Sequence, residues 1–338
     1  MKKKVSQKIS RAPAQRIAAQ KAKSTDAREA RIASHNGWPV ITKTKAETDF
    51  SDLLDANPGL QVLIPYPFDG IDDNDFHRHL GMLIDGLEML PKRPDHAFDF
   101  FFRAVDELSQ MMTGKTKITD AVESLGPRVC GSLATHDAWK SFINLFSGKL
   151  PTPTARFMAQ RVLDAYGVKK DPIRPRAERL FGEQRYKDFH QRFRGRFAVE
   201  DSKGLAGGAN NAGVFLKHLV SQRAARPVGS GDQSYPTLDL ADPSNIFDEP
   251  KALSAMMSLA AFTSRNERFH GSSLSPFRSS KASLSTYAGY YFEMLFVYTL
   301  AVGLMIELFD GCGDVDAWMI NMNENIVKLD KLFGKWIK

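Results

Sequence analysis

Cysteine is scarce in this sequence, with two residues, Cys130 and Cys312, that lie far apart and outside any metal-binding spacing. Structural zinc sites need closely spaced Cys or His ligands, and disulfide-rich secreted domains need several paired cysteines. The scarcity argues against both classes and suits a reducing compartment, so we expect a cytoplasmic protein. We expect no metal and no other cofactor.

Several other patterns are missing. There is no internal repeat, no run of alternating apolar and polar residues typical of strands, and no motif of serine hydrolases, zinc peptidases or kinases. Segment 204–213 is rich in glycine but lacks the Lys-Ser/Thr pair of a phosphate-binding loop. We interpret it as a flexible loop.

Signals for membrane insertion are weak. No apolar segment follows the N-terminal lysines, as a secretory signal would require. Residues 286–309 are long enough to span a bilayer, but Glu293 lies inside this stretch and Glu307 near its end. We therefore expect a central helix buried on most sides, and no membrane partner.

Apolar residues recur at helical spacing along most of the chain, which predicts an all-α bundle. His77 and His79 would lie on different faces of one helix, so the nearby aspartates 72, 73 and 75 are read as helix caps rather than as parts of a metal site. The run 60–68, broken by prolines, predicts a lone strand or an extended crossover. The expected helices are 72–90, 95–112, 135–146, 153–167, about 212–222, 251–269, 283–309 and 315–337.

Composition divides the chain into four parts. Residues 1–45 are expected to form a basic, partly flexible arm, and residues 46–167 the N-terminal helical part of the bundle. Residues 168–250 combine a basic Arg/aromatic segment with long loops, either as a separate domain or as an insertion. Residues 251–338 are predicted to form the last helices.

The net charge of +7 is concentrated in two segments. Residues 1–34 hold ten Lys or Arg against two acidic residues, and residues 169–196 hold ten against four. Such local charge favours an anionic partner, although a solvated surface is the alternative.

Arginine alternates with aromatic residues over 179–197, a pattern that can present guanidiniums to phosphates and rings to unpaired bases. The alternative is an amphipathic helix whose phenylalanines face the core, and we favour it for the rings but not for the arginines. The candidate RNA-binding residues are Arg179, Arg185, Arg192, Arg194, Arg196, Arg278 and Lys281.

The stretch SRNERFHGSS, residues 264–273, places three polar groups between two apolar segments. On a continuous helix Arg265 and His270 would differ by about 140° in direction, but Gly271 is a natural helix end that lets His270 bend toward the arginine. A histidine can move a proton of a ribose hydroxyl, an arginine can bind a phosphoryl group, and Asn266 can orient either. These residues suit phosphodiester chemistry, although a solvated helix end would look the same.

The arrangement Arg-Asn, three residues, His, then Gly, between apolar helices resembles the motif of the HEPN (higher eukaryotes and prokaryotes nucleotide-binding) family. The resemblance implies a helical bundle, often dimeric, in which two motifs form one composite ribonuclease site that needs no metal. By that resemblance Arg265 would bind the scissile phosphate, His270 would be the acid or base, and Asn266 would orient them.

The function expected from this resemblance is an endoribonuclease in phage defence or a toxin–antitoxin system. It would cleave RNA by attack of the 2′-hydroxyl, as a homodimer or with an inhibitory or guiding partner. Two alternatives stay open: an RNA- or nucleotide-binding HEPN protein without cleavage, and a helical interaction protein with a nucleic-acid-binding arm.

Overall fold

The structure is a computed structural model that describes residues 26–195, 201–221, 235–269 and 275–337, with backbone alone for 194–195 and 201–207. Within these ranges it contains helices and connecting segments but no strand, which confirms the all-α fold. The α-helices are α2 (Lys45–Asp55), α3 (Asn74–Glu88), α4 (Pro94–Thr113), α5 (Ile118–Cys130), α6 (His136–Lys149), α7 (Thr152–Ala165), α8 (Ile173–Phe181), α9 (Glu183–His190), α10 (Asp201–Val220), α11 (Glu249–Ala255), α12 (Phe262–Phe269), α13 (Leu284–Leu308) and α14 (Val315–Phe333).

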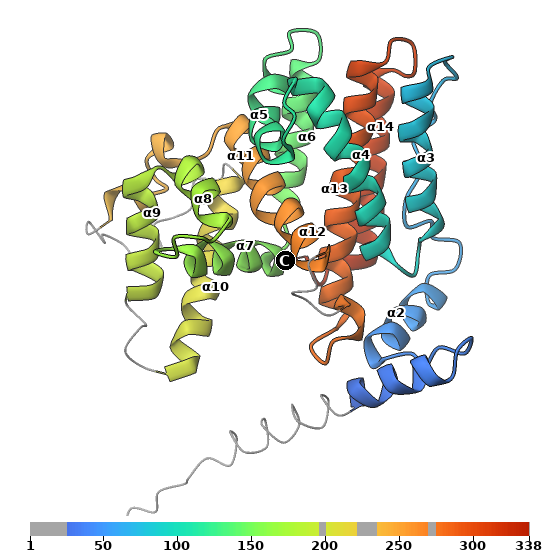
Figure 1. Cartoon of the computed structure of the whole chain (residues 1–338), viewed down its shortest axis with the longest axis horizontal. Helices are drawn as coiled ribbons and strands as arrows, with labels where there is room; N and C mark the ends of the chain where they lie inside the picture. The colour runs from blue at the N-terminus through green and yellow to red at the C-terminus, as the bar shows by residue number, and fades with distance from the viewer. Residues whose placement is uncertain (1–25, 196–200, 222–234, 270–274, 338) are drawn as a thin grey trace, which may run out of the picture.

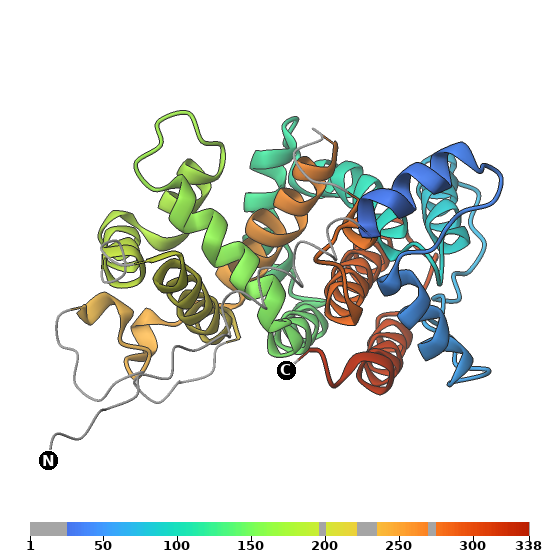
Figure 2. The ribbon, with the colours of Figure 1, turned by 90° about the horizontal axis from the view of Figure 1, so that it is seen from below.

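The helices are arranged around α13 (Figure 1). Helices α3, α4, α13 and α14 stand side by side, with α4 packed on α3 and α13, and α14 packed on α13. Helices α8, α9 and α10 form the opposite end of the molecule, and α7 runs across between the two groups (Figures 1 and 2). The site described below lies where α12 meets this bundle.

Helix α13 is the central buried helix expected from residues 286–309. By length and composition it could cross a membrane, with a hydropathy of 1.6, but 83% of its most apolar window is buried inside the protein. Neighbouring helices therefore cover the apolar side chains that would otherwise face lipid.

The predicted aspartate cap is confirmed, and a glycine ends the next helix. Asp73 begins α3 by accepting a hydrogen bond from the Phe76 amide at 2.8 Å, and Gly114 ends α4 in the left-handed conformation with φ 68°. His77 is exposed and His79 is fully buried, so the two histidines do face opposite sides of α3.

The predicted arm lies partly inside the described residues. Residues 26–36 are helical, and the Arg31 guanidinium donates to the carbonyl of Arg278. Thr44 also donates its hydroxyl to the Phe277 carbonyl at 2.9 Å. This part of the arm is therefore packed against the loop before α13, whereas residues 1–25 lie outside the described residues.

Residues 60–68 are the extended crossover and not the strand. The Ile64 amide donates to Asn325 Oδ1 at 2.7 Å, and the Asn325 Nδ2 donates back to the Ile64 carbonyl at 3.0 Å. The Tyr66 amide donates to the Tyr298 hydroxyl at 2.7 Å. Because side chains of α13 and α14 satisfy the backbone, the segment needs no neighbouring strand.

The expectation of a flexible loop at 204–213 is wrong, because these residues lie within α10. Gly213 explains why small residues occur here: a Cβ at this position would lie 2.7 Å from the Cα of Arg156 on α7. Glycine thus allows α10 to approach the backbone of α7 closely, and this contact offsets its poor helix propensity.

We expect Gly213→Ala to destabilise the fold by about 1–3 kcal/mol, because the added methyl group overpacks the contact with α7. Gly81→Ala is the matched control, since Gly81 lies within α3 and has nothing within 4 Å of the new Cβ. Gly81→Ala should be more stable than wild type by up to about 1 kcal/mol because alanine has the higher helix propensity. Urea unfolding measures the free energy of unfolding of both variants. Changes of the same sign in the two variants would contradict the close contact between Gly213 and α7.

Candidate functional site

Helix α12 carries the motif residues that the structure describes. It continues from α11 through a π-helical turn, Met256–Ala261, so the predicted helix 251–269 is one helical run with a wider segment. The Ser258 carbonyl at this turn accepts hydrogen bonds from the Thr263 hydroxyl and from the buried Arg176 of α8. The wide turn thus sets the direction in which α12 presents its side chains. His270 and Gly271 lie outside the described residues.

Arg265 is the motif arginine, and its side chain is held without an ion pair. Its Nη1 donates to Asn266 Oδ1 at 3.0 Å, and its guanidinium lies 4.5 Å from the centre of the Phe269 ring. No carboxylate of the described residues lies within 4.0 Å of it. Its remaining donors are therefore available for a ligand.

The next two charged residues of α12 fix this helix to its neighbours. Glu267 pairs with Arg161 of α7, with N–O distances of 2.5 and 2.8 Å. Arg268 donates to Asp99 Oδ2 at 2.6 Å and to the Asp95 carbonyl at 2.8 Å on α4. Glu267 and Arg268 therefore orient α12, while Arg265 is left to face the open space between α12 and α4.

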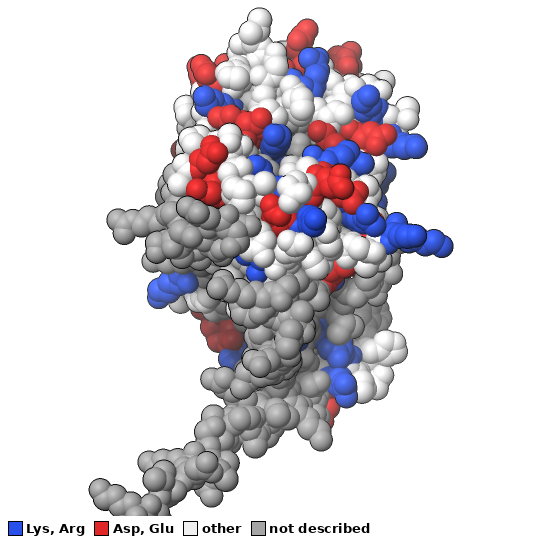
Figure 3. Space-filling view, turned by 90° about the vertical axis from the view of Figure 1, so that its left-hand side faces the viewer, with Lys and Arg blue, Asp and Glu red and all other residues white. Residues whose placement is uncertain are grey.

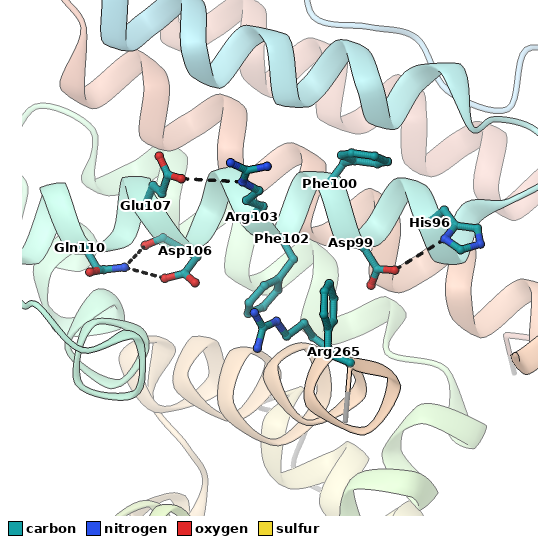
Figure 4. A pocket seen from close by; sticks show the side chains of 10 residues that line it. His96, Asp99, Phe100, Phe102, Arg103, Asp106, Glu107, Gln110 and Arg265 are labelled. Carbon is teal, nitrogen blue, oxygen red and sulfur yellow. Dashed lines mark hydrogen bonds and ion pairs between the residues drawn. The ribbon is translucent and has the colours of Figure 1, made fainter. Parts of the chain in front are cut away.

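That space is a cavity of about 740 Å³ between α4 and α12 (Figure 4). In Figure 4 Arg265 rises from α12 toward α4, and the polar side chains of α4 lie along the opposite wall. The volume is in the range of small-ligand sites. The lining residues are His96, Asp99, Phe100, Phe102, Arg103, Asp106, Glu107, Gln110, Arg265 and Phe269.

Asp99 and Asp106 of the wall hold their protons more tightly than usual. Burial raises the pKa of Asp99 to about 6 and also raises the pKa of Asp106, and the charge of Arg265 opposes both shifts. Burial lowers the pKa of His96, which favours the neutral imidazole. The cavity therefore combines a guanidinium, a neutral imidazole and carboxyl groups that are less acidic than in water.

Sequence reasoning did not identify the α4 wall. Its signal is a polar stripe at helical spacing, residues 96, 99, 103, 106 and 110, on a helix that is otherwise apolar. A solvated face gives the same pattern, so the proximity of this stripe to Arg265 becomes visible only in the fold.

The predicted RNA-binding residues whose side chains the structure describes do not line this cavity. Arg179 makes two hydrogen bonds to Glu123, Arg185 donates to Asn245, and Arg278 lies 3.5 Å from Glu47. Arg192 lies 5.5 Å from the centre of the Phe193 ring, and Lys281 is exposed. The side chains of Arg194 and Arg196 lie outside the described residues.

The rings of this segment that the structure describes face inward. Phe181, Phe189 and Phe193 are buried, and they belong to the same continuous core as the aromatic residues of α4 and α13. At the α9 end of the molecule, Lys and Arg are interspersed with Asp and Glu (Figure 3). For the rings, the amphipathic-helix interpretation is therefore the one that the structure supports.

Among the described residues, no group of three or more His, Cys, Asp or Glu is placed to hold a metal ion. Comparison with models of known protein families, with curated proteins and with solved structures finds no match for this chain. Its function therefore has to be inferred from the residues of the cavity.

Proposed function

We propose that this chain is a metal-independent endoribonuclease of the HEPN type. The observation that supports the proposal is the contrast between the two arginines of α12. Arg268 is held by two carboxyl residues of α4, whereas Arg265 lines a cavity and has no ion pair with any described residue. A guanidinium with free donors at a cavity wall suits a phosphodiester, which offers two non-bridging oxygens.

In the proposed reaction the ribose 2′-hydroxyl attacks the adjacent phosphorus while the bond to the 5′-oxygen breaks. Arg265 binds the phosphoryl oxygens as they gain charge, and Asn266 keeps the guanidinium in place through its 3.0 Å hydrogen bond. His270 moves protons, a role that comes from the family resemblance alone. The products are a 2′,3′-cyclic phosphate and a 5′-hydroxyl.

The biological setting is proposed on the same basis. The protein would act in the cytoplasm, in phage defence or a toxin–antitoxin system, as a homodimer that joins two motifs. An inhibitory or guiding partner would keep it inactive in the resting cell. The basic residues 1–34 would add attraction for RNA phosphates, so binding should weaken with salt.

The test is cleavage of end-labelled RNA in excess chelator. We expect Arg265→Ala to lower the cleavage rate about 10²–10³-fold, as removal of one donor to a developing oxyanion does, with RNA binding largely retained. His270→Ala should have a comparable effect. Arg103→Ala is the matched control, because Arg103 lines the same cavity from α4 and its side chain is 66% exposed.

Three results would count against the proposal. Wild-type protein that binds RNA without cleaving it would point to the binding function instead. Equal losses in the Arg103 and Arg265 variants would remove the special role of Arg265. Cleavage that stops in chelator would contradict the metal-independent reaction.

A further inference from the structure

His96 and Asp99 lie one helical turn apart on the α4 wall of the cavity (Figure 4). The His96 Nδ1 is 3.9 Å from Asp99 Oδ2, and the same oxygen accepts a 2.6 Å hydrogen bond from Arg268 of α12. Asp99 is thus fixed by α12, and its carboxylate lies beside the imidazole but beyond hydrogen-bond distance. The His96 side chain is 44% exposed, so its ring is accessible to a ligand.

We propose that His96 is a second proton-transfer residue of the Arg265 site. This inference rests on the proposed function, and it adds a residue that the HEPN motif does not contain. His96 is the only histidine among the described residues that line the cavity. An imidazole beside a carboxylate, in the same cavity as an unpaired guanidinium, is a suitable set for moving a proton next to a bound phosphate.

The step is an acid–base exchange. The Nε2 of neutral His96 takes the proton of the ribose 2′-hydroxyl, the 2′-oxygen forms its bond to phosphorus, and the phosphorus–5′-oxygen bond breaks. The 5′-oxygen leaves with a proton from solvent, and His96 then releases the proton it accepted to solvent. No oxidant, reductant or metal enters this balance.

The surroundings of His96 favour a base rather than an acid. Burial lowers its pKa, Asp95 opposes the shift, and the guanidiniums of Arg93, Arg268 and Arg278 add to it. The nearby Asp99, whose own pKa is raised to about 6, faces the imidazole from the same helix. A neutral ring at neutral pH can accept the hydroxyl proton directly.

The experiment compares wild type, His96→Ala and His96→Gln in single-turnover RNA cleavage with excess chelator. His35→Ala is the matched control, because His35 is exposed and its ring contacts the neighbouring Asn36 side chain. We expect the saturating single-turnover rate constant to fall about 10²–10³-fold in both His96 variants, with the half-saturating protein concentration nearly unchanged. The acidic limb of the pH–rate profile should also be lost, and added imidazole should restore part of the rate of His96→Ala but not of Arg265→Ala.

The failure of this inference is distinguishable from that of the proposed function. Cleavage by wild type together with an unaffected His96→Ala variant overturns the role of His96 and leaves the ribonuclease in place. Loss of rate without imidazole rescue, accompanied by a lower melting temperature, assigns His96 a structural role and also overturns it. Absence of cleavage by wild type overturns both proposals at once.

Discussion

Replacing Arg268 with alanine is expected to destabilise the fold by about 3–5 kcal/mol, the range for removing one partner of a buried ion pair. The Arg268 side chain is 10% exposed, and its partners Asp95 and Asp99 are 1% and 18% exposed. Asp95 would keep its two hydrogen bonds from Arg93, at 2.9 and 2.8 Å. Asp99 would lose its closest cation, and one of its oxygens, Oδ1, already has no hydrogen-bond partner.

The different partners explain why the two carboxyl groups titrate differently. Burial raises the pKa of Asp95, but the hydrogen bonds and the charge of Arg93 outweigh this effect and hold the pKa below its ordinary value. Asp99 has no such second arginine at hydrogen-bond distance among the described residues, and burial raises its pKa to about 6. The loss in Arg268→Ala should therefore shrink as the pH falls below 6, because protonated Asp99 no longer needs a cation.

Arg265→Ala is the internal control for this prediction. It lies on the same helix three residues earlier, but its guanidinium contacts Asn266 and Phe269 rather than a carboxylate. We expect a loss of less than about 1 kcal/mol in this variant. Urea unfolding at pH 7.5 and pH 5 measures both proteins, and equal losses would contradict the division between a structural and a ligand-facing arginine.

This division is not visible in the sequence, where Arg265 and Arg268 are two arginines three positions apart on one predicted helix. Which of them is buried depends on α4, because Arg268 reaches a carboxylate 169 positions earlier in the chain. The same reason hides His96: its nearness to Arg265 comes from the packing of α4 and α12 around one cavity. Chemistry that needs one motif can be predicted from the sequence, and chemistry that needs two helices in contact cannot.

More of the fold than of the site can be predicted from the sequence, because local patterns determine most of the helices. Apolar spacing, the cap at Asp73 and the left-handed Gly114 place α3 and α4 within a few residues of their observed ends. The second half of α10 agrees with the helix predicted at about 212–222, but its first half was predicted as a loop. The glycines and asparagines there lower helix propensity, and close packing on α7 compensates for this. The crossover at 60–68 was left ambiguous because its hydrogen-bond partners, Asn325 and Tyr298, lie more than 200 residues away.

Glu293→Gln is expected to stabilise the protein above pH 7 and to leave it nearly unchanged at pH 5. Glu293 is buried in α13 beneath Ser264, the residue before Arg265. Burial raises its pKa to about 7, although the Ser264 hydroxyl and the charge of Arg268 oppose the shift. The folded state therefore holds this proton more tightly than the unfolded state, whose carboxyl keeps the ordinary value of 4.5.

Because the folded state binds the Glu293 proton more tightly than the unfolded state does, the protonated form of Glu293 favours folding. The contribution of Glu293 to stability is fully present below pH 4.5, and it is lost as the pH rises through about 7. This difference between the folded and unfolded pKa values corresponds to a change of about 3 kcal/mol in the free energy of unfolding. Glutamine removes this pH dependence because its side chain does not titrate. Among the described residues Glu293 Oε2 already lacks a hydrogen-bond partner, so an amide there adds little further cost. We therefore expect Glu293→Gln to raise the free energy of unfolding by about 2 kcal/mol at pH 8.

Urea unfolding of wild type and Glu293→Gln between pH 5 and pH 8.5 measures the effect. Glu324→Gln is the matched control, because Glu324 is exposed on α14 and its substitution makes the same chemical change outside the core. The control should reproduce the wild-type pH dependence, whereas Glu293→Gln should flatten it. Parallel curves for wild type and Glu293→Gln would mean that Glu293 is hydrated in the folded protein, and its burial beside Ser264 would then have to be wrong.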